Sequence, residues 1–418
     1  MQDSIIRHLI KFNTIIIGGG PAGLFAGIHL KTGRNAILEK NSQAGKKLLI
    51  AGSGRCNITH IGLIKDFFEH YGAHSSFIKH ALKQYSNSDL LNFFENCGLK
   101  TIVDKNGKVF PFSEDSKDVL RLLEHQCERN STEILTKQNI SVTKTSDSGF
   151  LLITSESEFT CKNLIIATGG RSYPGTGSTG DGYEMAVSLG HSVIRQKPAL
   201  TPVFIKDYKF AELSGVSLSS RQVYIYRNSK KIKEHRGDFG FTHKGLSGPG
   251  ILDPSRFMEQ GDVLKINLAG TNITEFTSDF LSRASIQGKT TLLSFLKDYD
   301  IPKSLIKNIL QEIGLSADDT LAIITRPLRI KLAELFCEYP FHIEKIGGYE
   351  MAMTTAGGVD LDEISPKTME SKICKNLYFI GEILDIDGDT GGYNLQAAFS
   401  TAYAAAMNIN NSIDTSGI

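Results

Sequence analysis

The sequence predicts an α/β fold in which a parallel-sheet domain, made from both ends of the chain, is interrupted by a β-rich domain. Three observations support this prediction. A glycine-rich turn joins a strand to a helix near residue 20, and a second such turn lies near residue 390. Between residues 196 and 345 the pattern changes to short alternating strands. The predicted domains are therefore 1–195 with 346–418, and an insert at 196–345 that carries a helical subdomain at about 275–340.

The stretch from Thr14 to Lys40 predicts a strand, a tight turn, a helix and a second strand. The apolar run Ile15 to Ile17 ends in a Gly-x-Gly-x-x-Gly turn, and apolar residues at helical spacing follow it. A second apolar run ends in Glu39, which is 21 residues after the first glycine of the turn. This combination predicts a site for a dinucleotide.

Each glycine of this turn has its own physical role. Gly18 permits the turn out of the strand, Gly20 lets a pyrophosphate approach the backbone, and Gly23 lets the helix pack closely on the strand. The N-terminus of the helix offers free N–H groups to the phosphates. Glu39 accepts hydrogen bonds from ribose hydroxyls and repels a 2′-phosphate, so we expect an unphosphorylated adenosine diphosphate, as in FAD or NAD.

The composition argues against several classes of protein. The 418 residues include 46 Lys and Arg and 45 Asp and Glu, so the net charge gives no sign of a nucleic-acid partner, although a local basic patch would not show in this sum. The six cysteines form no C-x-x-C pair and no zinc-ligand spacing with histidine, which fits a reducing cytosol and no metal site. No run approaches the roughly 18 apolar residues that span a bilayer, and charges interrupt the first residues. We therefore expect a cytoplasmic protein with no signal peptide and no membrane partner.

A loop rich in small residues follows the second strand. Its Gly45-Lys46 pair does not belong to a P-loop, because Lys40 stands where the earlier glycine should be and no Ser or Thr follows Lys46. Two interpretations stay open from the residues alone. The loop either lies along a cofactor through Lys46, Arg55 and Asn57, or it is a surface loop.

The next segment mixes helices and strands. Apolar residues at helical spacing mark 77–99 and 116–130, with Ser116 as a candidate N-cap, and Asn106-Gly107 predicts a hairpin turn. Two strands follow, and the second ends in the small residues 167–170, which let a backbone pass close to a cofactor.

A second Gly-x-Gly-x-x-Gly match begins at Gly175. It does not predict another dinucleotide domain, because the run from the preceding strand is broken and Gln196 stands where the ribose-binding acid should be. We expect a glycine-rich lining that leads into a helix near Tyr183.

The C-terminal part repeats the pattern of strand, acid and helix. Leu377 to Ile380 predicts a strand that ends in Gly381-Glu382, and Gly391 and Gly392 open a helix. The aspartates between them do not form a calcium loop, because the sixth position is Thr390 and the twelfth is Gln396.

A helix N-terminus beside the second half of a dinucleotide favours flavin over nicotinamide. Reduced flavin carries negative charge, and N–H groups near residues 392–395 would stabilise it. The alternative is the glycine-capped helix of any α/β protein.

Six motifs carry a family resemblance when they are taken in order. They are GGGPAG, GKKLLIAGSGRCN, ATGGRSYPGTGSTGDGY, FTHKGLSGP, TTAGGV and GEILDIDGDTGGYNLQAAFSTAYAAA. From about Thr14 to Met407 the chain resembles the BaiN-like, aminoacetone-oxidase family of NAD(P)/FAD-dependent oxidoreductases, also called YhiN-type flavoproteins. One departure is Ser53, where that family commonly has glycine, a small change that leaves the backbone path intact.

The resemblance implies an FAD-binding Rossmann-like domain of the GR2 type, interrupted by a β-barrel-like domain with a helical insert. It places cofactor contacts at Gly18, Gly20, Gly23, Glu39, Lys46, Arg55, Asn57, Gly169, Gly381, Glu382 and Asn394. Neighbouring residues of the same motifs complete the candidate set: Pro21, Ala22, Lys40, Cys56, Ala167, Thr168, Gly170, Asp387, Gly392, Tyr393 and Leu395. Family members are associated with aminoacetone oxidation and with bile-acid reduction. The likeness therefore implies a class of chemistry but does not identify a particular reaction.

We therefore expect an FAD-dependent oxidoreductase. Hydride passes through the flavin to or from a small organic substrate held between the FAD domain and the insert, and NAD(P)H is a candidate transient reductant. His243 is a candidate catalytic acid or base, with a structural histidine as the alternative. Cys56 is either a redox thiol or a small packed residue. No nucleic-acid partner is expected, and the residues do not indicate an oligomeric state.

Two other functions stay open. TTAGGV followed by NLYFIGE resembles the end of fumarate-reductase-like flavoproteins, which favours a reductase of enones or other double bonds. Flavin re-oxidation by enones would distinguish it from an amine oxidase re-oxidised by O₂. A non-catalytic flavin-binding regulator, or a protein related to tRNA modification, belongs to a different class, and the lack of a basic tract argues against it.

Overall fold

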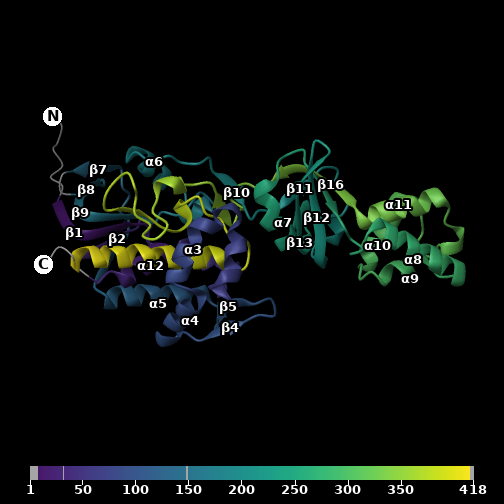
Figure 1. The fold of residues 1–418 in the computed structure, drawn as a ribbon, viewed down its shortest axis with the longest axis horizontal. Coiled ribbons are helices and arrows are strands. Elements are labelled where there is room, and N and C mark those ends of the chain that lie inside the picture. Colours follow the sequence, from purple (N-terminus) through teal and green to yellow (C-terminus); the bar gives the residue numbers. More distant parts are fainter. Residues whose placement is uncertain (1–7, 32, 147–148, 415–418) are drawn as a thin grey trace. The chain divides into compact units, whose positions relative to one another are not determined.

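The computed structural model describes residues 8–31, 33–146 and 149–414, and Figure 1 shows the path of the chain. The chain divides into two units. One is formed by the residues up to Pro198 together with those from Met353, and the other runs from Ala199 to Ala352. The first unit is therefore built from two distant pieces, and the second is a continuous insertion.

A mixed sheet forms the centre of the first unit. Its strands are β1 (His8–Ile17), β2 (Asn35–Leu38), β6 (Thr132–Leu135), β7 (Val142–Ser146), β8 (Gly149–Ile153), β9 (Ser157–Ile166) and β18 (Leu377–Phe379). Five of these strands run parallel in the order β6-β2-β1-β9-β18. β8 and β7 continue antiparallel from the first half of β9.

The five parallel strands end on one row of the sheet. Their last residues are successive register partners, in the order Leu135, Leu38, Ile17, Ile166 and Phe379. The ladder continues one residue further, since Glu39 N–H donates to Leu135 O at 2.9 Å and Gly18 N–H donates to Leu38 O at 2.9 Å. The segments that follow these strands therefore start side by side at the carboxyl edge, where open α/β sheets bind ligands.

Helices of the first unit pack on this sheet and on one another. They are α1 (Pro21–His29), α2 (Lys46–Ile50), α3 (Ser75–Gln84), α4 (Asn87–Asn96), α5 (Ser116–Arg129), α6 (Asp181–Ser188) and α12 (Tyr393–Asp414). The C-terminal helix α12, yellow in Figure 1, packs against α1 and α3, and Phe25 and Phe399 meet edge to face between α1 and α12. The C-terminal piece thus completes the core that the N-terminal piece begins.

The chain also forms two small sheets. A three-stranded sheet has the order β3-β5-β4, and β10 pairs with β17. Their bounds are β3 (Thr59–His60), β4 (Thr101–Val103), β5 (Lys108–Pro111), β10 (Lys197–Ala199) and β17 (Thr354–Ala356).

The second unit contains a closed six-stranded barrel. Its strands are β11 (Val203–Ile205), β12 (Ser217–Arg227), β13 (Lys230–Phe241), β14 (Gly245–Ser247), β15 (Val263–Ile266) and β16 (Tyr339–Ile346), in the order β11-β14-β13-β12-β15-β16. β11 also pairs with β16, which closes the barrel. Val223 and Ile225 of β12 are fully buried while Tyr224 between them is half-buried, as strand alternation requires.

Helices accompany the barrel in this unit. They are α7 (Pro249–Leu252), α8 (Ile273–Ile286), α9 (Leu292–Lys297), α10 (Lys303–Glu312) and α11 (Arg326–Cys337). Figure 1 shows α8, α9, α10 and α11 gathered as one group beside the barrel. The barrel and this group share one apolar core, which includes Phe341 of β16 and Phe336 of α11.

The structure confirms the predicted α/β class with a barrel-like insert and corrects two local predictions. β1 begins at His8, well before Ile15, because its first half pairs with β9. The N-cap of α5 is Asp115, whose side chain accepts from Lys117 N–H, and the hydroxyl of Ser116 instead donates to Leu49 O at 2.9 Å. The expectation about the extreme N-terminus concerns residues 1–7, which lie outside the described residues.

Candidate functional site

The turn between β1 and α1 needs glycine at two positions and leaves open space at a third. Gly18 has a φ of 105°, and a Cβ there would lie 2.5 Å from Ala167 O. A Cβ on Gly23 would lie 1.9 Å from Gly18 O, so the first turn of α1 packs directly on the loop. A Cβ on Gly20 would meet no described atom within 4 Å. The backbone at the N-terminus of α1 is thus open to a phosphate group.

Glu39 is held rigidly at the carboxyl end of β2. Only 7% of the residue is exposed. Gly19 N–H donates to Oε2 at 2.9 Å, and both the backbone N–H and Nδ2 of Asn41 donate to Oε1 at 2.7 Å. Lys46 Nζ donates to Asn41 Oδ1 at 3.1 Å, so this predicted contact reaches the acid through Asn41. Sequence reasoning missed Asn41, for which proximity to Glu39 was the sole signal.

Glu382 accepts hydrogen bonds from three other segments at the carboxyl edge of the sheet. It lies in the short 3₁₀ segment η8 (Gly381–Ile383) that follows β18. Ser172 Oγ donates to Oε1 at 2.8 Å and Thr355 N–H donates to the same oxygen at 3.0 Å. Lys47 Nζ donates to Oε2 at 2.7 Å. The sequence motifs predicted Lys46 as a contact and did not predict Lys47, Ser172 or Thr355, although all three stand inside those motifs.

Two of the predicted contacts carry buried oxygen atoms with no protein partner. Asn57 Oδ1 and Thr168 Oγ1 have no hydrogen-bond partner within residues 8–31, 33–146 and 149–414. A buried polar atom without a partner carries a free-energy cost unless a ligand or water satisfies it. Their burial therefore fits a bound group that presents hydrogen-bonding atoms at this edge.

The first turn of α12 closes the site on the C-terminal side. Its leading N–H groups have no partner within the helix and carry partial positive charge. Asn394 Oδ1 accepts from Gly388 N–H at 2.9 Å and Nδ2 donates to Gly388 O at 2.9 Å, so this side chain closes the preceding loop. A Cβ on Gly392 would lie 2.6 Å from the carbonyl carbon of Thr59, which explains the need for glycine there.

Two histidines that the motif search missed hold Tyr393 in place. Its ring stacks on His70 with centroids 3.9 Å apart and on His60 with centroids 5.5 Å apart. His70 Nδ1 lies 3.1 Å from Asp389 Oδ2, and Asp389 N–H donates to His70 O at 3.0 Å. These contacts fix the loop before α12. No motif or spacing in the sequence marks either histidine.

A second carboxylate of this loop faces another imidazole. His74 Nε2 lies 3.8 Å from Asp385 Oδ1. Burial raises the pKa of the Asp385 carboxyl, and the nearby His74 opposes that rise. Asp387, which lies between Asp385 and Asp389 in the sequence, is almost fully buried.

Two predicted basic contacts have acidic partners in the protein itself. Arg55 Nη1 donates to Glu114 Oε1 at 2.9 Å, and its guanidinium lies 4.5 Å from the centroid of Phe110. Lys40 Nζ donates to Asp181 Oδ2 at 2.6 Å. The remaining predicted contacts lie in the same strand-end loops and helix starts, namely Pro21, Ala22, Ala167, Gly169, Gly170 and Leu395.

Cys56 has the character of a packed residue. It is fully buried, and burial raises the pKa of its thiol to about 12. Such a thiol stays protonated near neutral pH and is a poor nucleophile. All six cysteines are free.

His243 belongs to the other unit. It is exposed on the turn between β13 and β14. Two hydroxyls bind Gly245 O and stabilise that turn: Thr242 Oγ1 at 3.1 Å and the Tyr208 hydroxyl at 2.9 Å. The imidazole is therefore presented to solvent from an ordered turn.

The described residues contain neither a candidate metal site nor a candidate membrane-spanning helix. There, no group of three His, Cys, Asp or Glu side chains could bind a metal ion. No helix in that part combines the length and the apolar character that crossing a bilayer requires.

A family model described as the HI0933-like protein Rossmann domain matches residues 12–408. The chain belongs to the HI0933-like family. The resemblance inferred from the motifs is thereby confirmed, and the HI0933-like chain is a member of a family of Rossmann-fold flavoprotein oxidoreductases.

Two relatives align with this HI0933-like chain over nearly its whole length. A protein of Haemophilus influenzae named ribosomal RNA dihydrouridine synthase is 32% identical, and the alignment covers 94% of this chain and 98% of the relative. A protein of Clostridium scindens named 3-dehydro-bile acid delta(4,6)-reductase is 31% identical over 93% of this chain and 97% of the relative.

A solved structure shares the fold. The quinol fumarate reductase chain FrdA of Escherichia coli superposes with a TM-score of 0.54 at 13% identity, covering 98% of this chain and 72% of that one.

Proposed function

We propose that this HI0933-like protein binds FAD and reduces a carbon–carbon double bond that is conjugated to a carbonyl group. The proposed FAD site rests on one observation: five parallel strands end at the same level, along the carboxyl edge of the sheet. This arrangement puts the Gly18 turn, Glu39 and Glu382 at one edge of a single sheet, although they come from both ends of the chain.

Each part of the edge suits a different part of FAD. The open backbone at Gly20 takes the pyrophosphate, and Glu39 accepts from the adenosine ribose. Glu382 and the buried oxygens of Asn57 and Thr168 face the central part of the cofactor. The N-terminus of α12 stabilises negative charge on the ring. When bound, FAD supplies the hydride chemistry that protein side chains lack.

The names of both relatives favour a carbon–carbon double bond as the group that is reduced. Dihydrouridine differs from uridine by saturation of the C5=C6 bond, which is conjugated to the C4 carbonyl. The name delta(4,6)-reductase likewise describes reduction of double bonds in a 3-keto compound. Such a reduction delivers a hydride to the β carbon and a proton to the α carbon. This common chemistry favours the double-bond reductase over the amine oxidase.

Two substrate classes remain. The first is a small enone, which the sequence leaves open as an alternative. The second is a uridine in RNA, and the local charge of the insert favours it. Residues 221–238 contain six Lys or Arg and two Asp or Glu, a formal net charge of +4, while the whole chain has +1. NAD(P)H as the electron donor, and the residues assigned to the cofactor, remain part of the proposal.

The test begins with the purified protein and its absorbance spectrum. We expect the peaks of bound flavin, bleaching on anaerobic addition of NADH or NADPH, and recovery of the oxidised spectrum on addition of a conjugated enone. In parallel, ribosomal RNA from a strain that lacks the gene is incubated with the reduced protein and analysed for dihydrouridine by mass spectrometry.

The outcomes separate the candidate functions. Re-oxidation by O₂ with no response to enone or RNA would favour an amine oxidase. A colourless protein that stays empty in excess FAD would contradict the proposal as a whole. The variant Glu39→Ala is the matched control, because it removes the ribose acceptor and should lose the flavin.

A further inference from the structure

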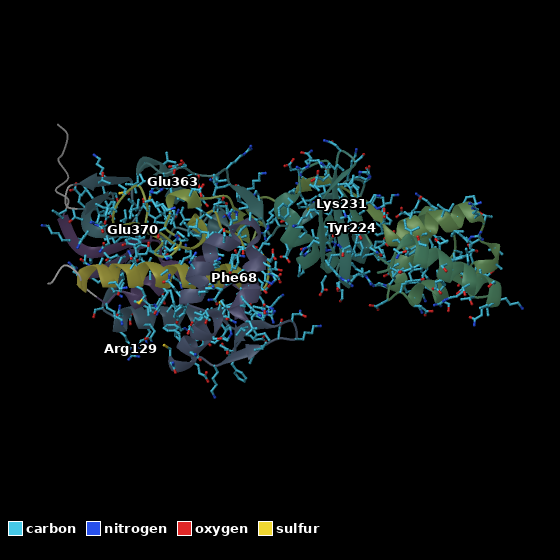
Figure 2. All side chains as sticks on the ribbon, viewed as in Figure 1. Phe68, Arg129, Tyr224, Lys231, Glu363 and Glu370 are labelled. Atoms are coloured by element: carbon cyan, nitrogen blue, oxygen red, sulfur yellow. The ribbon has the colours of Figure 1, made fainter. Side chains whose placement is uncertain are left out.

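We propose that His70 donates the proton of the reaction, a role that rests on the proposed double-bond reduction, and that Asp389 positions its ring. His70 lies in the 3₁₀ segment η2 (Ile64–His74), and Figure 2 labels Phe68, two residues before it. Both residues of the pair belong to the first unit, which also contains the residues proposed to bind FAD.

The contact between the two side chains decides which nitrogen of His70 can react. His70 Nδ1 lies 3.1 Å from Asp389 Oδ2. An ionised carboxylate has no proton to donate, so the hydrogen of this bond belongs to Nδ1. The other nitrogen, Nε2, has no hydrogen-bond partner among residues 8–31, 33–146 and 149–414. Nε2 is therefore the atom that can exchange a proton with a ligand.

Further contacts hold the ring of His70 in one orientation. Asp389 N–H donates to His70 O at 3.0 Å, so one residue contacts both the backbone and the ring. The imidazole stacks on Tyr393, with centroids 3.9 Å apart and planes inclined by 15°. Tyr71, the next residue in the chain, donates its hydroxyl to Tyr393 O at 2.8 Å. A fixed orientation of this kind is what a catalytic acid requires.

The same contacts relate His70 to the proposed flavin site. Its stacking partner Tyr393 is the first residue of α12, and the N-terminus of this helix is the part proposed to stabilise the flavin ring. Gly392, one residue earlier, packs on Thr59. Asn57, two residues before Thr59, has a buried Oδ1 without a partner in the described chain. His70 thus lies in the corner of the site where the start of α12 meets the loop that ends at Asn57.

Of the side chains in this corner, His70 is the acid that a substrate can reach. Its side chain is 31% exposed, whereas Tyr393 is 5% exposed and Tyr71 is fully buried. A tyrosine hydroxyl that is bonded to a backbone oxygen and shielded from solvent cannot contact a substrate. The exposed part of His70 leaves room for a ligand beside the imidazole.

The two other imidazoles nearby are less suited to this role. Both ring nitrogens of His60 lie 2.7 Å from backbone oxygens, those of Ile61 and Asn106. Neither nitrogen of His60 is therefore available to a substrate. His74 Nε2 lies 3.8 Å from Asp385 Oδ1, which is beyond hydrogen-bonding distance, so this carboxylate does not fix the ring.

The reaction needs one proton for each hydride. The β carbon of the conjugated double bond receives a hydride from reduced FAD, and the electron pair of that bond moves to the α carbon. His70, protonated on both nitrogens, donates the Nε2 proton to the α carbon. The double bond is then saturated, the flavin is oxidised, and the imidazole is neutral with its proton on Nδ1. Solvent returns the Nε2 proton before the next turnover.

Two variants of His70 separate proton donation from structure. His70→Asn keeps an N–H group for Asp389, and His70→Phe keeps a ring that can stack on Tyr393. The control is His80→Asn, which removes a half-buried imidazole of α3 in the same unit. Each flavin-loaded protein is reduced with dithionite and mixed anaerobically with a conjugated enone in a stopped-flow instrument. Both His70 variants should slow re-oxidation by about 10²–10⁴ and keep the wild-type Kd for FAD, while the control keeps the wild-type rate.

Nitrogen NMR gives a readout that does not depend on turnover. In protein labelled with ¹⁵N-histidine, the neutral form of His70 should carry its proton on Nδ1, and the signal missing from His70→Asn assigns it. In Asp389→Ala the two neutral forms of the ring should mix. The same variant should lower kcat and leave KM for the enone nearly unchanged, because Asp389 acts on the substrate only through His70. A wild-type ring that already mixes both forms would overturn the positioning role.

The outcomes distinguish this proposal from the function on which it rests. Wild-type re-oxidation rates in both His70 variants would overturn the role of His70 and leave the double-bond reductase standing. A normal rate in His70→Phe alone would reduce that role to stacking, and loss of FAD from both variants would make it structural, so either result also overturns the proposal. Wild-type protein that neither an enone nor ribosomal RNA re-oxidises would overturn the reductase itself, and the role of His70 with it.

Discussion

Lys47 Nζ lies 2.7 Å from Glu382 Oε2, and this contact joins helix α2 to the C-terminal piece of the same unit. The two residues are 335 positions apart in sequence. Glu382 also accepts from Ser172 and Thr355, so one carboxylate connects four segments. Both partners of the pair are less than a quarter exposed, which limits screening by water.

Replacing this lysine should weaken flavin binding more than replacing its neighbour. Lys47→Met leaves the partly buried Glu382 carboxylate without its cation, and hydrogen bonds to charged groups contribute about 1.5–3 kcal/mol each. We expect the Kd for FAD to rise about tenfold or more. Lys46→Met, which removes only the contact with Asn41, should have a smaller effect. Flavin fluorescence titration measures both, and a larger loss in Lys46→Met would contradict the role given to Lys47.

Two alanine substitutions in one turn should separate folding from binding. Gly23→Ala places a Cβ 1.9 Å from Gly18 O, and overpacking of this kind costs about 1–3 kcal/mol or more. Gly20→Ala meets no described atom within 4 Å, and the φ of Gly20 is −78°, which alanine adopts readily. Gly20→Ala should therefore keep the thermal stability of the apoprotein and lose FAD affinity.

Thermal melts of the apoproteins and FAD titrations together test this pair. Gly23→Ala should lower the Tm before any ligand is added. Similar melting of both variants would show that the close approach at Gly23 is relieved by a small backbone shift.

The sequence predicts the binding elements better than the side chains that complete them. The Gly18 turn and the Glu382 strand end carry strict local requirements, so spacing identifies them. Lys47 acts through Glu382, a partner that only folding brings near, and Asn41 has no local signal except its position two residues after Glu39. The start of β1 was missed for a related reason, since its first half is stabilised by pairing with β9 and not by an apolar run.

Cys56 should be chemically inert in the folded protein. Burial raises the pKa of its thiol to about 12, so almost none of it is thiolate at pH 8. Iodoacetamide should label the partly exposed Cys97 and Cys374 first, and Cys56 only after unfolding. Cys56→Ala should retain reduction of the flavin by NAD(P)H. Peptide mass spectrometry identifies which cysteines are labelled. Rapid labelling of Cys56 in the folded protein would favour its interpretation as a redox thiol.

His191 should make the protein less stable in acid. Burial lowers the pKa of its imidazole below 6.5, and Glu363 at 2.9 Å only partly opposes this. The unfolded chain therefore binds the proton more readily. The stabilisation is complete above about pH 6.5, and it is lost as the pH falls toward the folded-state pKa. In urea titrations at pH 7.5 and 5.0, His191→Gln should lose less free energy of unfolding between the two pH values than the wild type. An equal loss would place the acid sensitivity elsewhere.

His243 tests whether the barrel unit takes part in catalysis. If its imidazole supplies the proton that accompanies hydride addition, His243→Ala should slow substrate-dependent re-oxidation of the flavin by about 10²–10⁴. Reduction by NAD(P)H should keep its rate, because that step does not use the proton. His342→Ala removes another exposed imidazole from the same barrel and serves as the control. Stopped-flow measurement of the two half-reactions across pH 5.5–8.5 decides the matter. Unchanged re-oxidation in His243→Ala would leave this residue with no catalytic role and direct the search for the proton donor to the loop around His70 and Asp389.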